Sequence, residues 1–209
     1  MTSPFVTTAP ATFGGTETFL DRVAFGKALA EKLGATLVVN QDDSPNMPRY
    51  WAVSLHFDGW QMRITDLAYK GKVGRAWLNA CPISGDSPGK PIDWPNAEVD
   101  SGRDMQALVN DIRRRIVTPA EDCETQLATQ RGEALRVKAE AAADAERLRM
   151  LFPSLHVSLD GDTVRISGGT SGAYILARMN AGRLYIERAG SFDAATSENV
   201  LRAMIGGAG

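Results

Sequence analysis

The sequence is poor in the residues that build metal centres and disulfide frameworks. Its 209 residues include only two cysteines, Cys81 and Cys123, and only two histidines. The cysteines do not form a Cys-x-x-Cys pair, which excludes a disulfide framework and favours a reducing cytoplasm. With so few ligands, a four-ligand zinc site of the usual Cys/His spacing cannot be assembled within one chain. We interpret both cysteines as small core residues.

Long apolar runs and a large excess of charge of either sign are missing too. No apolar run approaches the ~20 residues that span a bilayer, and residues 1–15 lack the basic and apolar regions of a secretory signal. The 23 basic and 25 acidic side chains leave a net charge of −2, so a basic field over the whole molecule is excluded. Hydrophobic residues make up 44% of the chain, the ordinary range for folded proteins. We therefore expect a folded cytoplasmic protein with no membrane partner.

Familiar catalytic sets are absent as well. The sequence contains no Gly-x-Ser-x-Gly elbow, and we interpret His56 and His156 as strand residues rather than catalytic bases. The glycine-rich segment 167–172 lacks the lysine of a phosphate-binding loop and precedes a predicted strand, so we interpret it as a hairpin connection. We accordingly predict no cofactor, no resident metal and no catalytic residue.

The order of the predicted elements indicates an α+β fold. Residues rich in threonine, proline and glycine at the start predict a flexible arm. Two strand-rich regions flank a segment dominated by Ala, Glu, Arg, Leu and Lys, the best helix formers. We expect two related units, each an antiparallel sheet with a helix on one face, joined by this long helix. The predicted segments are a flexible N-terminal arm at 1–17, a first α+β unit at 18–118, a long connecting helix at 119–152 and a second α+β unit at 153–209.

Turn and capping residues place the elements of the first unit. Thr18 is expected to cap a helix that runs to residue 33. Alternating apolar and polar residues on both sides of Asp58-Gly59 predict a hairpin, whereas the proline-rich stretch 84–100 is expected to be a loop. Ser101 is the expected N-cap of a further helix, and Pro119 is expected to end that helix or to start the next one.

The two strand-rich regions resemble each other. Residues 54–65 align with residues 157–167, which places Asp58-Gly59 on Asp160-Gly161. Residues 110–116 align with residues 199–205, within a final helix expected at 193–205. The two alignments occur in the same order along the chain. We therefore predict that the units are copies of one duplicated scaffold.

Two groups of basic residues and one tryptophan are the candidate binding sites. Lys70, Lys72 and Arg75 surround a hairpin tip near aromatic residues, and such interleaving can hold a phosphate backbone and stack bases. Three successive arginines at 113–115 fan around a helix, so at least two of them face solvent. Exposed aromatic and arginine side chains are also typical of protein interfaces, and the proline-rich loop can present Trp94. The candidate binding residues are Trp60, Lys70, Lys72, Arg75, Trp94, Arg113, Arg114 and Arg115.

The helix after the first sheet carries a pattern in which Ser and Arg precede an Asp-Ile pair, two arginines and a proline. Its residues are Ser101, Arg103, Asp111, Ile112, Arg114, Arg115, Ile116 and Pro119. About a third of the chain thereby resembles small uncharacterised proteins encoded by phages and other mobile elements. The resemblance implies an accessory protein in a bacterial cell. Many such accessories, anti-CRISPR proteins among them, bind a host effector complex without catalysis. That family has no assigned catalytic residues.

These observations predict a non-enzymatic binding protein of a phage or mobile element. We expect it to inhibit a host nucleic-acid-targeting defence complex, such as a CRISPR effector, through protein contacts. One alternative is a DNA- or RNA-binding accessory module that uses the basic residues. A second is a metal-dependent nuclease or hydrolase that uses the acidic pairs Asp42-Asp43 and Asp160/Asp162. A homodimer formed through the Ala-rich helix also remains open.

Overall fold

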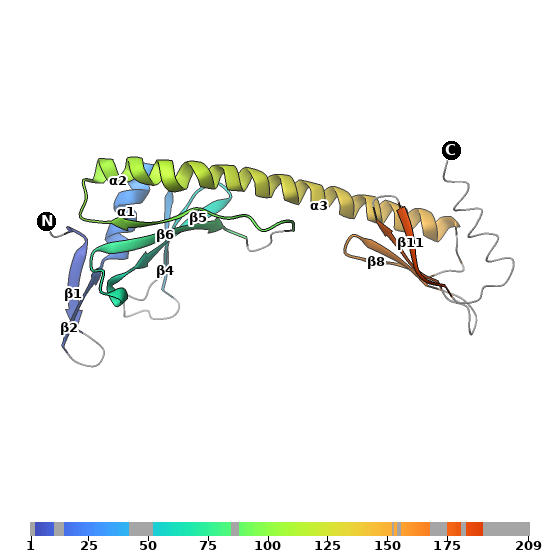
Figure 1. The fold of residues 1–209 in the computed structure, drawn as a ribbon, viewed down its shortest axis with the longest axis horizontal. Coiled ribbons are helices and arrows are strands. Elements are labelled where there is room, and N and C mark those ends of the chain that lie inside the picture. Colours follow the sequence, from blue (N-terminus) through green and yellow to red (C-terminus); the bar gives the residue numbers. More distant parts are fainter. Residues whose placement is uncertain are drawn as a thin grey trace. The chain divides into compact units, whose positions relative to one another are not determined.

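The computed structural model has two compact units, Met1–Thr129 and Gln130–Gly209. The boundary between them falls inside the long helix α3 (Thr118–Leu151). Antiparallel sheets combined with helices confirm the predicted α+β class (Figure 1). The structure describes residues 3–10, 15–41, 52–84, 88–151, 153, 156–167, 175–180 and 183–189.

A five-stranded antiparallel sheet forms the centre of the first unit, in the order β3-β4-β5-β6-β7. The expected hairpin at Asp58-Gly59 is confirmed, because it joins β4 to β5, and Gly59 has the positive φ of 79° that this turn needs. The prediction that 84–100 is a loop is wrong at its end, where β7 forms against β6. The strands are β3 (Thr36–Asn40), β4 (Ala52–His56), β5 (Trp60–Asp66), β6 (Arg75–Pro82) and β7 (Asn96–Asp100).

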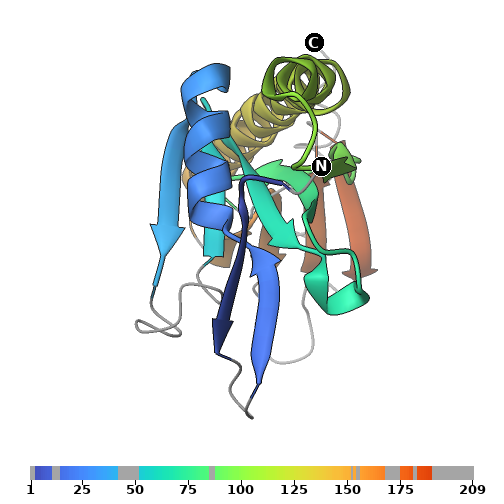
Figure 2. The ribbon, with the colours of Figure 1, turned by 90° about the vertical axis from the view of Figure 1, so that its left-hand side faces the viewer.

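Much of the expected N-terminal arm is a hairpin. Strands β1 (Val6–Pro10) and β2 (Thr16–Leu20) pair antiparallel and lie side by side in Figure 2. The ring of Phe5, just before β1, lies 5.3 Å from the ring of Phe25 in the core, which ties the hairpin to the unit. The prediction of a flexible arm at 1–17 is therefore wrong for the strand residues, because threonine-rich segments pair readily once a core is nearby.

Helix α1 (Arg22–Leu33) begins later than expected. The carboxylate of Asp21 accepts a hydrogen bond from the backbone N–H of Ala24 at 2.9 Å, so Asp21 is the N-cap and not Thr18, which lies in β2. Gly26 marks a close approach between this helix and the sheet. A Cβ atom at Gly26 would lie 3.0 Å from Cδ1 of Leu37.

Helix α2 (Met105–Ile112) runs through a π-helical turn, η3 (Arg113–Val117), directly into α3, and Figure 1 shows this continuous rod. The predicted N-cap is wrong, because Asp104, not Ser101, accepts a hydrogen bond from the N–H of Ala107, at 2.9 Å. Pro119 does not break the rod. Proline lacks an N–H and its ring crowds the carbonyl four residues earlier, and the wide turn just before it accommodates both defects.

The core of the first unit lies between one face of its sheet and the helices. Alternate residues of each strand point to that face, as the period of a strand requires. The face is covered by α1, α2, η3 and the start of α3. The largest fully buried side chains are Leu20, Phe25, Leu29, Leu55, Trp60, Met62, Ile64, Leu78, Leu108, Ile112, Ile116 and Leu127.

The second unit contains a four-stranded antiparallel sheet in the order β11-β10-β9-β8. A small core joins Ala141 and Ala145 of α3 to Val157, Val164 and Ile166 of the sheet. The expected helix at 193–205, and all of the glycine-rich segment after Ser167, lie outside the described residues. The strands are β8 (His156–Asp160), β9 (Thr163–Ser167), β10 (Ile175–Asn180) and β11 (Arg183–Ala189).

The predicted duplication is not confirmed. Both units contain a meander of four successive strands, which is a common arrangement of antiparallel sheets. The pairing registers differ, however. In the first unit Ser54 lies opposite Arg63, so the sequence alignment would place His156 opposite Arg165, but Ser158 occupies that place.

Helix α3 is as long as the composition predicts. Its 34 residues extend over about 51 Å at 1.5 Å per residue. Buried side chains occur up to Leu127 and again from Ala141, and the helix residues in between are half-buried or exposed. Among the helices that the structure describes, none combines the length and apolar character needed to cross a membrane.

Candidate functional site

The face of the first sheet that points away from the helices is a candidate binding surface. On β5 and β6, Met62 and Leu78 are buried in the core, while Arg63 and Trp77 on the opposite face are exposed. We call the outward-pointing residues of β4–β7 the open sheet face. They are Ala52, Ser54, His56, Gln61, Arg63, Thr65, Arg75, Trp77, Asn79, Cys81, Asn96, Glu98 and Asp100.

Trp77 occupies a central place on the open sheet face. It lies directly opposite Thr65 on β5 and Glu98 on β7. Arg63 is its diagonal neighbour, within reach of long side chains. Trp77 is 37% exposed, although Trp is highly buried on average. The ring of Trp77 therefore lies among polar and basic side chains on a solvent-accessible surface.

Glu98 binds two of the basic residues that the sequence singled out. Lys72 Nζ lies 2.6 Å from its Oε2, and Arg75 Nη1 lies 2.9 Å from its Oε1. These hydrogen bonds, from Lys72 first and Arg75 second, hold the pKa of Glu98 below its ordinary value. The three side chains come together as one mixed-charge group at the edge of the open sheet face, and its net charge is smaller than the sequence suggested.

One of the aromatic residues predicted to accompany these basic residues, Trp60, lies in the core instead. Trp60 is only 2% exposed and stacks on Phe57, with 4.1 Å between ring centroids. Its selection as a binding residue is wrong, because the alternation of β5 points it into the core. Trp94 is half-buried and packs against the same core. Lys70 lies over the exposed ring of Tyr69, with Nζ 5.4 Å from the centroid, next to the turn before β6.

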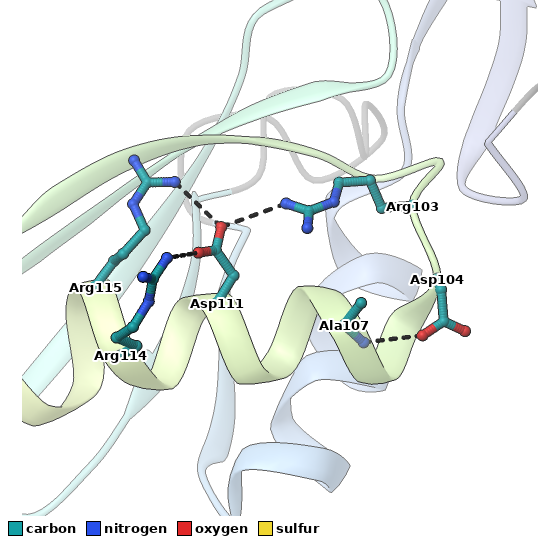
Figure 3. Close-up of polar contacts among 6 residues, drawn as sticks. All are labelled: Arg103, Asp104, Ala107, Asp111, Arg114 and Arg115. Carbon is teal, nitrogen blue, oxygen red and sulfur yellow. Dashed lines mark hydrogen bonds and ion pairs between the residues drawn. The ribbon is translucent and has the colours of Figure 1, made fainter.

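A second candidate surface is an arginine cluster on the α2–η3 rod, shown in Figure 3. Asp111 accepts hydrogen bonds from Arg103 at 3.3 Å, Arg114 at 2.8 Å and Arg115 at 3.2 Å. Hydrogen bonding by Arg114, followed by the contributions of Arg115 and Arg103, lowers the pKa of the Asp111 carboxyl below its ordinary value. The carboxylate is 15% exposed and Arg114 is 79% exposed, so the cations are the more accessible part.

Arg113 is separated from its two neighbours in sequence. Its Nη2 donates to the backbone carbonyl of Lys32, in the last turn of α1, at 2.8 Å. It thus satisfies a helix-terminal carbonyl, as cations often do at that position. Of the three arginines at 113–115, Arg113 therefore caps the end of α1, whereas Arg114 and Arg115 belong to the arginine cluster. Site prediction from sequence missed Arg103, which precedes Asp111 by eight residues, or slightly more than two helical turns.

The residues proposed for a metal-dependent hydrolase do not form a site within the described chain. Among the described residues, no group of three or more His, Cys, Asp and Glu side chains is arranged to hold a metal ion. Asp160 forms an ion pair with Arg165 of the adjacent strand. Asp42 and Asp43 lie outside the described residues.

The cysteines are not activated nucleophiles. Burial raises the pKa of the Cys81 thiol, and burial together with nearby Asp122 raises that of Cys123. A raised pKa favours the protonated thiol, which is the less nucleophilic form.

Known proteins were compared with the chain in three ways. The scan against family models, the search of curated proteins and the search of solved structures each returned no match.

Proposed function

We propose that this protein is a non-enzymatic binding protein whose open sheet face contacts a protein partner. The observation that carries the proposal is the exposed indole of Trp77 among Arg63, Thr65 and Glu98. Tryptophan and arginine are the residue types most enriched among the side chains that dominate binding energy at interfaces. A rim of polar and oppositely charged groups around such an anchor is typical of protein interfaces.

The charge of this face favours a protein over a nucleic acid as its partner. Glu98 neutralises part of the positive charge of Lys72 and Arg75, and a carboxylate at that place would repel a phosphate backbone. Protein surfaces carry both signs of charge and can complement such a group.

The partner that we propose is a subunit of a host nucleic-acid-targeting defence complex, such as a CRISPR effector, in a bacterial cell that carries the phage or mobile element. This finer proposal rests on the likeness of the helix around Asp111 to helices of mobile-element accessory proteins. An inhibitor of this kind needs a binding surface rather than a reaction centre.

The test compares the wild-type chain with Trp77→Ala in cells that carry an active defence system. We expect wild-type expression to restore plaque formation or plasmid uptake, and purified wild-type protein to retain a subunit of the complex on a column. Trp77→Ala should lose both effects, since truncating an interface anchor typically costs more than about 1 kcal/mol of binding energy.

Tyr69→Ala is the matched control, because Tyr69 is 72% exposed but lies in the connection between β5 and β6, outside the open sheet face. It should behave like the wild type. Thermal melting of each variant verifies that the unit is folded. A wild-type chain that neither lowers interference nor retains any defence subunit would refute the proposal.

A further inference from the structure

We infer that the arginine cluster of Arg103, Arg114 and Arg115 around Asp111 binds the phosphodiester backbone of a nucleic acid. This surface is distinct from the open sheet face, because its residues lie on the α2–η3 rod and on the turn before it. The inference does not rest on the proposed protein partner.

The first argument is charge. Three guanidinium groups share a single carboxylate, so two positive charges are left uncompensated within the cluster. Asp111 is 15% exposed, whereas the three arginine side chains are between 44% and 79% exposed. A polyanion that approaches the rod therefore meets guanidinium groups before it meets the carboxylate.

The second argument is the order imposed on these long side chains. Figure 3 shows the guanidinium groups of Arg103 and Arg115 reaching Asp111 from opposite sides. Each guanidinium carries five N–H donors, and the contacts with Asp111 involve one nitrogen of each arginine. The contacts with Asp111 already restrict the arginine side chains, so less rotamer freedom is lost when the remaining donors bind phosphate oxygens.

The third argument is the extent of the positive charge. The guanidinium groups of Arg103, Arg114 and Arg115 converge on the single carboxylate of Asp111. Arg113 extends the positive charge to the end of α1 through its contact with Lys32. Positive charge at two places on the first unit suits a chain of repeated phosphates better than one isolated phosphate group. Guanidinium contacts with phosphates carry no base information, so we expect binding to be independent of sequence.

Three further carboxylates lie near the cluster in sequence, Asp104, Glu121 and Asp122. In the described part of the chain, the carboxylate that forms ion pairs with the cluster is Asp111. Glu121 and Asp122 follow Arg115 by six and seven residues, about 9 to 10 Å along a helix, so their effect is screened at physiological salt.

The test measures fluorescence anisotropy of a labelled duplex DNA of random sequence, and of the matching single strand, as the full-length chain is titrated at increasing salt concentration. We expect log K to fall linearly with log salt for the wild type. Arg114→Gln with Arg115→Gln should lower the affinity about tenfold or more and reduce the slope by about two, since each lost phosphate contact removes roughly 0.9 from it.

Arg136→Gln is the matched control, because Arg136 is an exposed arginine on α3 that pairs with a glutamate one turn away, Glu140. It should leave both affinity and slope unchanged. Trp77→Ala should also bind DNA like the wild type, so that failure of this inference and failure of the proposed function are distinguishable. The inference is overturned if the wild type binds neither DNA, or if the double variant and the wild type have the same slope.

Discussion

Ser101 and Gly74 are joined by two hydrogen bonds to one carbonyl oxygen. The hydroxyl of Ser101 donates to the Gly74 carbonyl at 2.6 Å, and the Ser101 backbone N–H donates to the same oxygen at 3.0 Å. Ser101 is 1% exposed, and the Ser3 hydroxyl lies 2.7 Å from its oxygen. One buried side chain thus connects the end of β7, the turn before β6 and the N-terminal segment.

Replacing Ser101 by Ala is expected to destabilise the first unit. Loss of a buried hydroxyl that serves two partners should cost about 1–2 kcal/mol in the free energy of unfolding. Urea denaturation followed by tryptophan fluorescence measures the change. Thr8→Ala, which removes an exposed hydroxyl with one long contact to Thr18, should change the same quantity by less than about 0.5 kcal/mol. Equal values for the two variants would contradict the structural role of Ser101.

Gly59 should tolerate a side chain less well than Gly71. Both have positive φ, 79° and 73°, so each Ala variant has the strain of a left-handed residue, about 1–2 kcal/mol. A Cβ at Gly59 would also lie 2.5 Å from Oε1 of Glu124, whereas at Gly71 it would meet nothing within 4 Å. We therefore expect Gly59→Ala to have the lower midpoint of thermal unfolding. A lower midpoint for Gly71→Ala would contradict the close contact with Glu124.

Gly132→Ala should stabilise helix α3. Gly132 is exposed, lies inside the helix, and has open space where a Cβ would be placed. Alanine is favoured over glycine inside a helix by about 0.8–1 kcal/mol, mainly because it loses less backbone freedom on folding. Slower hydrogen exchange of the amides around residue 132 would report this gain. An unchanged exchange rate would show that the helix does not open locally at that point.

The contribution of Asp111 to stability should depend on pH. The three arginines lower the pKa of Asp111 below its ordinary value of 3.8. The folded state therefore favours the carboxylate, and the resulting stability is present above that ordinary pKa and lost as pH falls through the folded pKa. Asp111→Asn should melt at a lower temperature than the wild type at neutral pH, and the difference should shrink at pH values below 3.8. A difference that is constant with pH would exclude this origin.

Local sequence signals account for the hairpin at Asp58-Gly59, for the turn at Gly161 and for the inward face of α2. Asp58-Gly59 and Gly161 lie at tight turns because glycine adopts positive φ without strain, and this preference does not depend on distant residues. The burial of Leu108, Val109 and Ile112 likewise follows from helical spacing.

Features that depend on tertiary contacts were not predictable in this way. Ser101 and Asp104 are both acceptable N-caps, and the buried bonds of Ser101 to Gly74 leave that role to Asp104. Tryptophan is a residue type that is common at interfaces, yet the position of Trp60 in β5 directs its side chain into the core. Arg103 joins the arginine cluster only because the turn before α2 brings it back beside Asp111.

The strand order of the two larger sheets also bears on how the chain acquires its structure. In both sheets the described strands follow one another in space as they do along the chain, so each ladder joins consecutive strands. Pairings between near neighbours close short loops, which favours rapid folding. During synthesis, each strand after the first emerges from the ribosome when its partner is already present, so the time for which an unpaired edge is exposed to aggregation is short.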